Sequence, residues 1–180
     1  MNVSLFITPE GITPEQLKKK RKALGLTQKE FAELIGMSKP TIERWEASDK
    51  IITGPVVQLL QLLTPDYIES IKIPEKTLPI RLWYMYKENV CTLIDVDERK
   101  QIIRIRNYTK NRQFRAFGVN EEPTFEDYQD FLKSRCFAES RDKMKLILRD
   151  LNLPFYDPFM IIKKTEGRMA EDDFWLKVEV

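Results

Sequence analysis

One short stretch, residues 38–44, gathers the side chains that proteins use to contact DNA bases. Lysine and arginine donate hydrogen bonds to guanine N7 and O6, glutamate accepts one from the cytosine amino group, and threonine contacts a thymine methyl group or a phosphate. The candidate residues are Lys39, Pro40, Thr41, Glu43 and Arg44. They occupy outward positions near the start of a short helical pattern, so the stretch predicts contact with the major groove of double-stranded DNA.

Two short helical patterns position these residues, and a break at Gly36 separates them. Glycine suits the left-handed residue that ends a helix, and the break lets the second helix cross the first at a steep angle. Apolar residues are spaced to bury one face of each helix. They are Leu24, Leu26, Phe31, Leu34, Ile35, Met37, Ile42 and Trp45. This geometry leaves the outer face of the second helix free to enter a groove.

Residues 13–72 are predicted to be entirely helical, because helix start signals recur through them. Threonine or serine stands before several starts, and Gln or Glu three residues later completes a capping box in two of them. The predicted starts lie at Thr13–Gln16, Thr27–Glu30, Ser38, Thr53–Pro55 and Thr64–Asp66. Gly25 and Gly36 are predicted to be left-handed C-terminal caps. The first domain is therefore expected to be mainly α, with five short helices.

The segment LKKKRKALGLTQKEFAELIGMSKPTIERWE, followed by GPVVQLLQLL, resembles the Cro/Xre family of phage-repressor-type helix-turn-helix domains over residues 14–63. The resemblance implies a five-helix domain that binds a palindromic operator as a dimer. It also implies that Gln28 contacts the DNA backbone or a base, with residues 39–44 as the reading face. The tail is similar to that of antitoxin-type members, although the zinc-finger cysteines of one such group are absent here.

Charged residues of the first and third helices have structural as well as functional interpretations. The family resemblance pairs Arg21 with Glu46 as an internal ion pair, which orients helices more than it stabilises them. The basic run KKKRK at residues 18–22 is either a solvated helix face, the commoner role of such a run, or a phosphate contact through Lys19 or Lys22.

The pattern changes after the helical region. Residues 73–80 carry two prolines without a helical period and are predicted to link domains 1–72 and 81–180. From residue 81 the apolar period is about two, which predicts a three-stranded antiparallel meander, with DFWLKVEV as a further strand at the end. Helix starts are predicted at Thr124, Ser140 and Asp157. The second domain is therefore expected to be α+β, with a small antiparallel sheet and three helices.

Basic and aromatic residues are interleaved through the last part of the meander. They are Arg99, Lys100, Arg104, Arg106, Lys110, Arg112 and Arg115, with Tyr108, Phe114 and Phe117. Such a surface binds single-stranded nucleic acid when its rings stack on bases. The commoner alternative is a solvated hairpin face, or a face packed against the acidic helices that follow. Because strand residues alternate, Ile103 and Ile105 should face away from Arg104 and Arg106.

The net charge of +2 is unevenly distributed. Residues 13–63 carry nine Lys/Arg and six Asp/Glu, residues 76–120 carry ten and four, and residues 121–180 carry ten and fourteen. A basic front and middle favour a polyanionic partner, whereas the acidic rear favours a different role.

We expect no enzymatic activity, cofactor or metal. The chain has no histidine, which is the commonest general base and metal ligand. No pair of nucleophile and base is evident. Glu171, Asp172 and Asp173 are consecutive, and consecutive strand residues face opposite sides, so the three cannot converge on one ion. Cys91 and Cys136 lie in apolar contexts and are expected to be buried free thiols.

The segment from Phe131 to Val178 resembles small accessory proteins found beside HipA-like kinases, and the first subdomain of HipA-type proteins. The shared pattern is a meander, a helix–helix pair and a final acidic-aromatic strand. This resemblance implies a partner-binding or toxin-regulating module. It implies no kinase activity here, because a Gly-rich phosphate loop and a catalytic Asp with a downstream Asn are missing.

These patterns predict a sequence-specific transcriptional repressor, an antitoxin-like or phage-type autoregulator that binds a palindromic operator as a homodimer. The second domain would oligomerise or bind a protein partner, such as a toxin or a host effector. The alternative is a protein-binding inhibitor, antitoxin or phage anti-defence protein that uses the helix-turn-helix only for autoregulation. No apolar run approaches the ~20 residues that span a bilayer, and the N-terminus lacks signal-peptide features. A cytoplasmic location without a membrane partner is expected.

Overall fold

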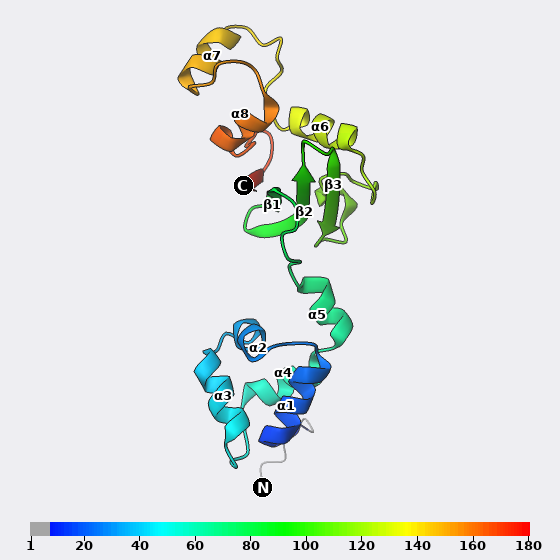
Figure 1. Ribbon diagram of the computed structural model, residues 1–180, viewed down its shortest axis with the longest axis vertical. Helices are drawn as coiled ribbons and strands as arrows, with labels where there is room; N and C mark the ends of the chain where they lie inside the picture. The colour runs from blue at the N-terminus through cyan, green and yellow to red at the C-terminus, as the bar shows by residue number, and fades with distance from the viewer. Residues whose placement is uncertain (1–7) are drawn as a thin grey trace. The chain divides into compact units, whose positions relative to one another are not determined.

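The computed structural model describes residues 8–180 (Figure 1). The chain divides into two compact units, one ending at Ile73 and the other beginning at Pro74. Each unit contains its own cluster of buried apolar side chains. Each therefore has a hydrophobic core of its own.

Five short helices build the first unit. They are α1 (Pro14–Ala23), α2 (Gln28–Leu34), α3 (Lys39–Ala47), α4 (Pro55–Leu62) and α5 (Pro65–Ile71). The capping boxes predicted at Thr13 and Thr27 both form. Ser38 and Thr64 each accept a hydrogen bond from the backbone N–H three residues later. Only α4 among these five begins without a side-chain cap. The predicted mainly helical fold is confirmed.

Gly25 and Gly36 turn the chain after α1 and α2. Their φ angles are +70° and +69°, a region that residues with a Cβ rarely adopt. In the second turn, the Gly36 N–H donates to the Glu33 carbonyl, and the Met37 N–H donates to the Ala32 carbonyl at 2.8 Å. These bonds satisfy carbonyls at the end of α2 and reverse the chain toward α3.

The core of the first unit holds most of the residues predicted to be buried. The fully buried side chains come from four helices and include Leu17, Phe31, Ile42 and Leu60. The prediction is wrong for Met37, which is 42% exposed. Met37 follows the left-handed Gly36, beyond the end of α2, where the helical period no longer determines which side chain faces inward. Three others lie at the border of the core and are only partly buried: Leu34, Ile35 and Trp45.

The second unit contains one four-stranded antiparallel sheet. Its strands are β1 (Ile80–Tyr86), β2 (Asn89–Asp97), β3 (Ile102–Asn107) and β4 (Phe174–Glu179), in the order β3-β2-β1-β4. The predicted meander and the C-terminal strand are both confirmed. β4 joins the free edge of β1, where Tyr84 lies opposite Leu176.

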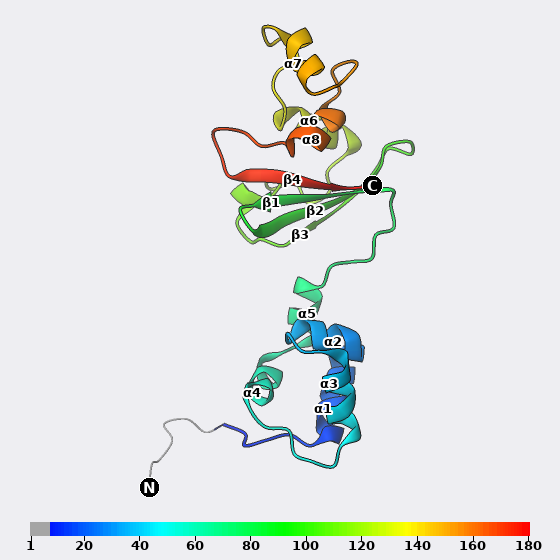
Figure 2. The same ribbon diagram turned by 90° about the vertical axis from the view of Figure 1, so that its left-hand side faces the viewer.

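Helices cover one face of this sheet. The helical segments of the second unit are η1 (Arg112–Phe114), α6 (Phe125–Ser134), α7 (Met144–Asp150) and α8 (Pro158–Thr165). Figure 2 shows the three α-helices on the same side of the sheet. Buried side chains of the strands, such as Leu82 and Ile94, pack with α6 and α8 on this side, and Ile103 and Ile105 join them. The predicted α+β arrangement with three helices is confirmed.

The opposite side of the sheet is called the open face below. It carries residues 81, 83 and 85 of β1, 93 and 95 of β2, 104 and 106 of β3, and 175, 177 and 179 of β4. Arg104 and Arg106 lie on this face, as the strand alternation predicts. Within residues 74–180, no helix packs on it.

The start of α7 differs from the prediction. The helix begins at Met144 rather than after Ser140, and Lys143 precedes it with a φ angle of +59°. A side-chain cap requires an extended residue immediately before the helix. Ser140 instead lies in a turn closed by a backbone bond within residues 138–141, so it cannot act as that cap. α6 and α8 begin where they were predicted to begin.

Candidate nucleic-acid interface

The N-terminal half of α3 presents the predicted contact residues together. Lys39, Pro40, Glu43 and Arg44 are exposed, and Thr41 is half-buried. On the opposite side of the helix, Ile42 is fully buried and Trp45 packs against the core. The buried side anchors α3, so its outer surface is held in a fixed orientation. We call this surface the α3 face.

Contacts within the α3 face are weak enough for DNA to replace. Lys39 Nζ lies 2.9 Å from Glu43 Oε1, and both side chains are about half exposed. Exposed ion pairs of this kind contribute ~0.2–1 kcal/mol. The hydroxyls of Ser38 and Thr41 are 2.9 Å apart. The side chain of Arg44 forms no hydrogen bond or ion pair with any residue from 8 to 180, so its guanidinium group is available to a ligand.

A buried ion pair fixes the helices behind this face. Arg21 Nε donates to Glu46 Oε1 at 2.6 Å, and Arg21 Nη2 donates to Glu46 Oε2 at 3.0 Å. Arg21 Nη1 also donates to the Leu26 carbonyl at 2.7 Å. The two charged side chains are 9% and 4% exposed. The pair joins α1 to α3, and the third bond attaches both to the turn before α2.

Gln28 belongs to the same network. Its Nε2 donates to Glu46 Oε2 at 3.0 Å. Burial raises the pKa of Glu46, but hydrogen bonds from Arg21 and Gln28 outweigh that effect, so the pKa lies below its ordinary value. The carboxylate therefore stays ionised at neutral pH. One amide N–H of Gln28 is committed to this contact, which leaves its second N–H and its carbonyl oxygen for DNA.

The basic run of α1 is divided between two sides of the helix. Lys19 is exposed and lines a surface depression together with Ile12, Leu60 and Gln61, next to α4. Lys18 lies toward α3, because its charge lowers the pKa of Glu46. Lys22 is exposed one helical turn after Lys18. Sequence reasoning did not select Lys18, since the run alone does not show which lysines lie beside α3.

The basic and aromatic residues of the second unit do not form one surface. Phe114 and Phe117 pack against the hydrophobic core. Arg115 donates to the Thr109 carbonyl at 3.0 Å and to Glu121. Arg106 remains on the open face, with its guanidinium 5.7 Å from the centre of the Tyr108 ring. The predicted single-strand surface is therefore split.

The open face contains aromatic residues that the sequence analysis did not select. Trp83 and Trp175 lie on it, and Lys177 pairs directly opposite Trp83. The alternation of side chains within RLWYMY and FWLKVE, together with antiparallel pairing of the two segments, would place both tryptophans on the same face. The pairing of β4 with β1 cannot be derived from either segment alone.

The acidic run before β4 serves the fold. Asp172 accepts two hydrogen bonds from the buried Arg135 at 2.7 and 3.0 Å, and Asp173 lies 3.4 Å from Lys87 Nζ. Within residues 8–180, no group of three His, Cys, Asp or Glu side chains is placed to hold a metal ion. Cys91 and Cys136 are both buried and unpaired, and burial raises the pKa of the Cys136 thiol to about 12. Across residues 8–180, none of the helices has the length and apolar content to cross a membrane.

Comparison with known proteins identifies the first unit. A protein-family model described as Helix-turn-helix matches residues 17–62, which run from within α1 to the end of α4. No curated protein and no solved structure matches the chain. None of the comparisons supports the resemblance of the second half to proteins of HipA operons. Residues 17–62 therefore form a helix-turn-helix domain of the Cro/Xre type, a class of domain that binds DNA.

Proposed function

We propose that the protein is a transcriptional repressor that binds a palindromic operator as a homodimer, with α3 in the major groove. The observation that carries this proposal is the α3 face, which is polar, exposed and anchored from behind by buried side chains. A recognition helix contacts base edges with its N-terminal residues. The α3 face lies at that end of the helix.

The side chains of the α3 face have distinct proposed roles. Arg44 donates to guanine N7 and O6, because its guanidinium group has no partner in residues 8–180. Lys39 and Glu43 separate on binding, after which Lys39 contacts a guanine or a phosphate and Glu43 accepts from a cytosine amino group. Thr41 contacts a thymine methyl group, and Pro40 limits how closely the first turn approaches the groove.

Contacts to the DNA backbone are proposed for residues beside α3. Gln28 stands at the first position of α2 and retains one amide N–H for a phosphate oxygen. Lys22 and Lys18 are proposed phosphate contacts on the α3 side of α1. Lys19 lies beside α4 and would contact DNA only where the duplex bends toward α1. Phosphate contacts supply affinity and register, whereas contacts to base edges supply specificity.

The second unit is proposed to oligomerise or to bind a protein partner. The protein would then act as an antitoxin-like or phage-type autoregulator, with the two activities on separate units. Its α7 region favours a partner role. In α7 no residue is buried, while Leu146 and Phe155 are 45% and 59% exposed. A protein-binding inhibitor that uses its helix-turn-helix only for autoregulation remains the second candidate, and this exposed apolar segment is the observation that favours it.

The proposed function is tested by selecting duplexes from a random pool with the full-length protein. We expect a palindromic consensus whose half-sites lie about 10 base pairs apart, or a multiple of that spacing. The matched comparison is between Arg44→Ala and Lys145→Ala, since both residues are exposed and only Arg44 lies on α3. Selection of no consensus, or equal loss of binding in both variants, would show that α3 does not read sequence.

A further inference from the structure

We propose that the open face of the sheet in the second unit binds single-stranded nucleic acid. This activity is separate from duplex recognition by the first unit. Proteins bind single strands by stacking bases on exposed aromatic rings while cations track the backbone, and a four-stranded sheet can present such rings on one face. The open face supplies both kinds of group on neighbouring strands.

The aromatic side chains of the open face come from two strands and from the residue that follows a third. Trp83 of β1 pairs with Lys177 of β4, and Met85 pairs with Trp175, so the two indole rings lie on adjacent strands one diagonal step apart. Tyr108 follows β3, and its N–H donates to the Cys91 carbonyl at 2.9 Å, which continues the ladder with β2. All three aromatic residues are partly exposed. They provide a series of flat surfaces across the sheet.

Each of these rings has a cation beside it. Lys177 Nζ lies 6.0 Å from the centre of the Trp83 ring, and the Arg106 guanidinium lies 5.7 Å from that of Tyr108. The Arg168 guanidinium lies 4.8 Å from the Trp175 ring. Lys177 makes no ion pair with any residue from 8 to 180. Each ring that could stack on a base therefore has a positive charge close to it.

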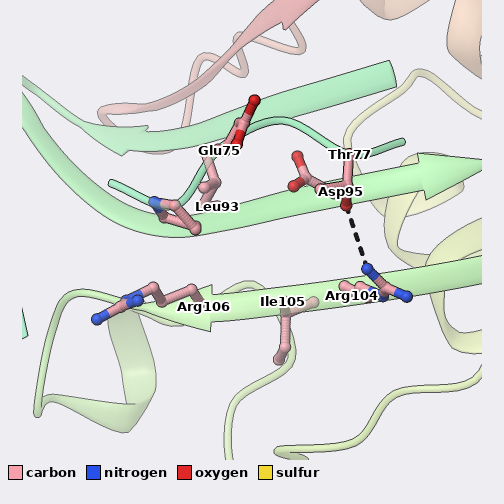
Figure 3. A pocket seen from close by; sticks show the side chains of 8 residues that line it. Glu75, Thr77, Leu93, Asp95, Arg104, Ile105 and Arg106 are labelled. Atoms are coloured by element: carbon pink, nitrogen blue, oxygen red, sulfur yellow. Dashed lines mark hydrogen bonds between the residues drawn. The ribbon is translucent and has the colours of Figure 1, made fainter. Parts of the chain in front are cut away.

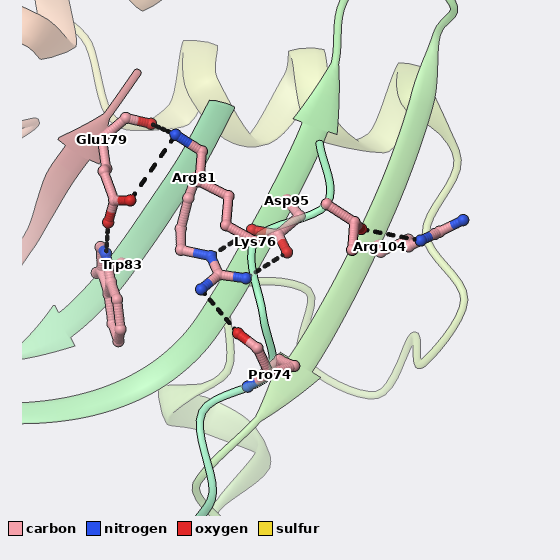
Figure 4. Close-up of polar contacts among 8 residues, drawn as sticks. Pro74, Lys76, Arg81, Trp83, Asp95, Arg104 and Glu179 are labelled. Carbon is pink, nitrogen blue, oxygen red and sulfur yellow. Dashed lines mark hydrogen bonds and ion pairs between the residues drawn. The ribbon is translucent and has the colours of Figure 1, made fainter. Parts of the chain in front are cut away.

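The carboxylates of the open face are already neutralised. Asp95 accepts from Arg81 Nε at 2.6 Å and from Arg81 Nη2 at 2.7 Å, and both residues are buried (Figure 4). Glu179 accepts from the Trp83 indole and lies 3.8 Å from Lys76 Nζ. The remaining charge of the open face is positive. A polyanion would therefore meet attraction rather than repulsion there.

A hollow lies on the open face over β2 and β3. Pro74, Glu75 and Thr77 form one wall, and Leu93, Asp95, Arg104, Ile105 and Arg106 line the rest (Figure 3). Its volume is about 420 Å³. Arg104 is exposed and is held there by a 3.1 Å hydrogen bond to the Thr77 hydroxyl (Figure 3). Asp95 is paired with Arg81, so the two arginines face one other carboxylate there, the exposed Glu75, and the charge of the hollow stays positive for a phosphate.

The strength of stacking decides whether a base can displace the cations from the rings. A base stacked on an aromatic side chain strengthens binding by about 5- to 150-fold. A cation over an exposed ring is worth only about 2- to 5-fold. An incoming base therefore displaces Lys177 from Trp83, and the released ammonium group can pair with the adjacent phosphate. Arg168 also pairs with Glu166 at 2.8 Å, so its charge is already partly neutralised. A duplex offers no such contact, because its bases are stacked on one another.

The test uses the full-length chain with Lys39→Ala and Arg44→Ala, so that the α3 face does not contribute. Fluorescence anisotropy measures binding to labelled oligothymidylate and oligouridylate of about 20 nucleotides, longer than the usual site size. Neither probe forms a duplex, and the difference between them assigns DNA or RNA as the ligand. Trp83→Leu and Trp175→Leu remove rings, with exposed Phe155→Leu as the matched control.

Lys177→Gln removes a charge without disturbing packing, because Lys177 is exposed. Its matched control is Lys163→Gln, which removes an exposed lysine that also rests 5.8 Å from an aromatic ring, but on α8. Thermal unfolding of each variant establishes that it is folded. If a tryptophan variant fails to fold, the Lys177 and Lys163 pair decides the outcome.

We expect each tryptophan variant to weaken binding of one probe at least fivefold. Lys177→Gln should weaken it and lower its salt dependence, and both controls should bind like the parent. The proposal is wrong if the parent binds neither probe, or if the open-face variants bind as tightly as the controls. It is also wrong if the tryptophan variants only convert a dimer to a monomer in gel filtration. Duplex binding by the chain with an intact α3 tests the proposed repressor function separately.

Discussion

Removing Arg21 should reveal how strongly the buried ion pair supports the first unit. Arg21 makes two hydrogen bonds to Glu46 and one to the Leu26 carbonyl. Arg21→Met would leave a carboxylate that is 4% exposed with only Gln28 as a partner. Leaving a buried charge without its counterion costs about 3–5 kcal/mol. We expect Arg21→Met to lower the free energy of unfolding of the first unit by that amount.

The double variant distinguishes the cost of an unpaired charge from the net contribution of the pair. Replacing a buried pair by apolar residues of similar volume is often neutral or stabilising. Arg21→Met combined with Glu46→Met should therefore recover most of the lost free energy. Recovery would show that the pair orients α1 against α3 rather than stabilising the fold. A double variant as unstable as Arg21→Met would contradict this.

Urea unfolding followed by the fluorescence of Trp45 measures these differences. Trp45 is the single tryptophan of the first unit, so Trp83→Phe and Trp175→Phe make the signal specific to it. The pKa of Glu46 is lowered by folding, so its contribution is complete above the unfolded value of 4.5 and is lost as the pH falls through the folded pKa. The cost of Arg21→Met should shrink as the pH falls, because protonation then neutralises the buried Glu46 carboxylate that Arg21 no longer pairs. A cost under about 1 kcal/mol at pH 7, or one independent of pH, would refute the reasoning.

Three further predictions concern the first unit. Glu43→Ala should change the free energy of unfolding by less than about 1 kcal/mol, since its pair with Lys39 is exposed. Operator selection with this variant should show an altered base preference at one position. An unaltered preference would show that Glu43 does not contact a base. Trp45→Ala should lower the free energy of unfolding in a urea titration by about 2 kcal/mol. This is less than the loss of about 3–5 kcal/mol at a fully buried tryptophan, because Trp45 is only partly buried. An unchanged free energy of unfolding would show that Trp45 does not contribute to the core. The hydrogen bond from Lys72, with those from Thr27, lowers the pKa of Glu30 to about 2. Lys72→Ala should therefore raise the pKa of Glu30 in an NMR titration. An unchanged pKa would contradict the contact between Glu30 of α2 and Lys72 at the end of α5.

Local signals predicted the helices well, because their causes are local. A threonine that caps a helix bonds to a backbone N–H three residues later, and a left-handed glycine closes the turn that precedes or follows it. The same reasoning failed at Ser140, where a turn formed by the preceding residues outweighed the cap signal. Met37 was wrongly predicted to be buried, because it lies beyond the end of α2, where helical periodicity no longer indicates which side chains face the core.

Contacts between distant segments could not be derived in the same way. Alternation predicted correctly that Arg104 and Arg106 face away from Ile103 and Ile105. It could not show that Phe114 joins the core, because η1 interrupts the strand period. The open face depends on the pairing of β4 with β1, two segments that lie about ninety residues apart in the sequence.

Residue types and spacing predicted the residues of the α3 face. The structure adds which of their side chains already form ion pairs or hydrogen bonds. Lys39 and Glu43 are paired, whereas the side chain of Arg44 makes no polar contact with residues 8–180. Gln28 is held by Glu46, which the sequence alone does not indicate. The division of the α1 lysines also needed the helix orientation, since Lys18 lies toward α3 and Lys19 lies beside α4.

The most direct test of the account is the specificity of Arg44→Ala on a selected duplex. The measurement compares affinity for the selected duplex with affinity for a scrambled duplex at one salt concentration. A bidentate contact to guanine contributes about 1–3 kcal/mol of discrimination. We predict that Arg44→Ala lowers the ratio of the two affinities by about 5- to 150-fold and leaves binding to the scrambled duplex nearly unchanged. An unchanged ratio would show that α3 is not the recognition helix.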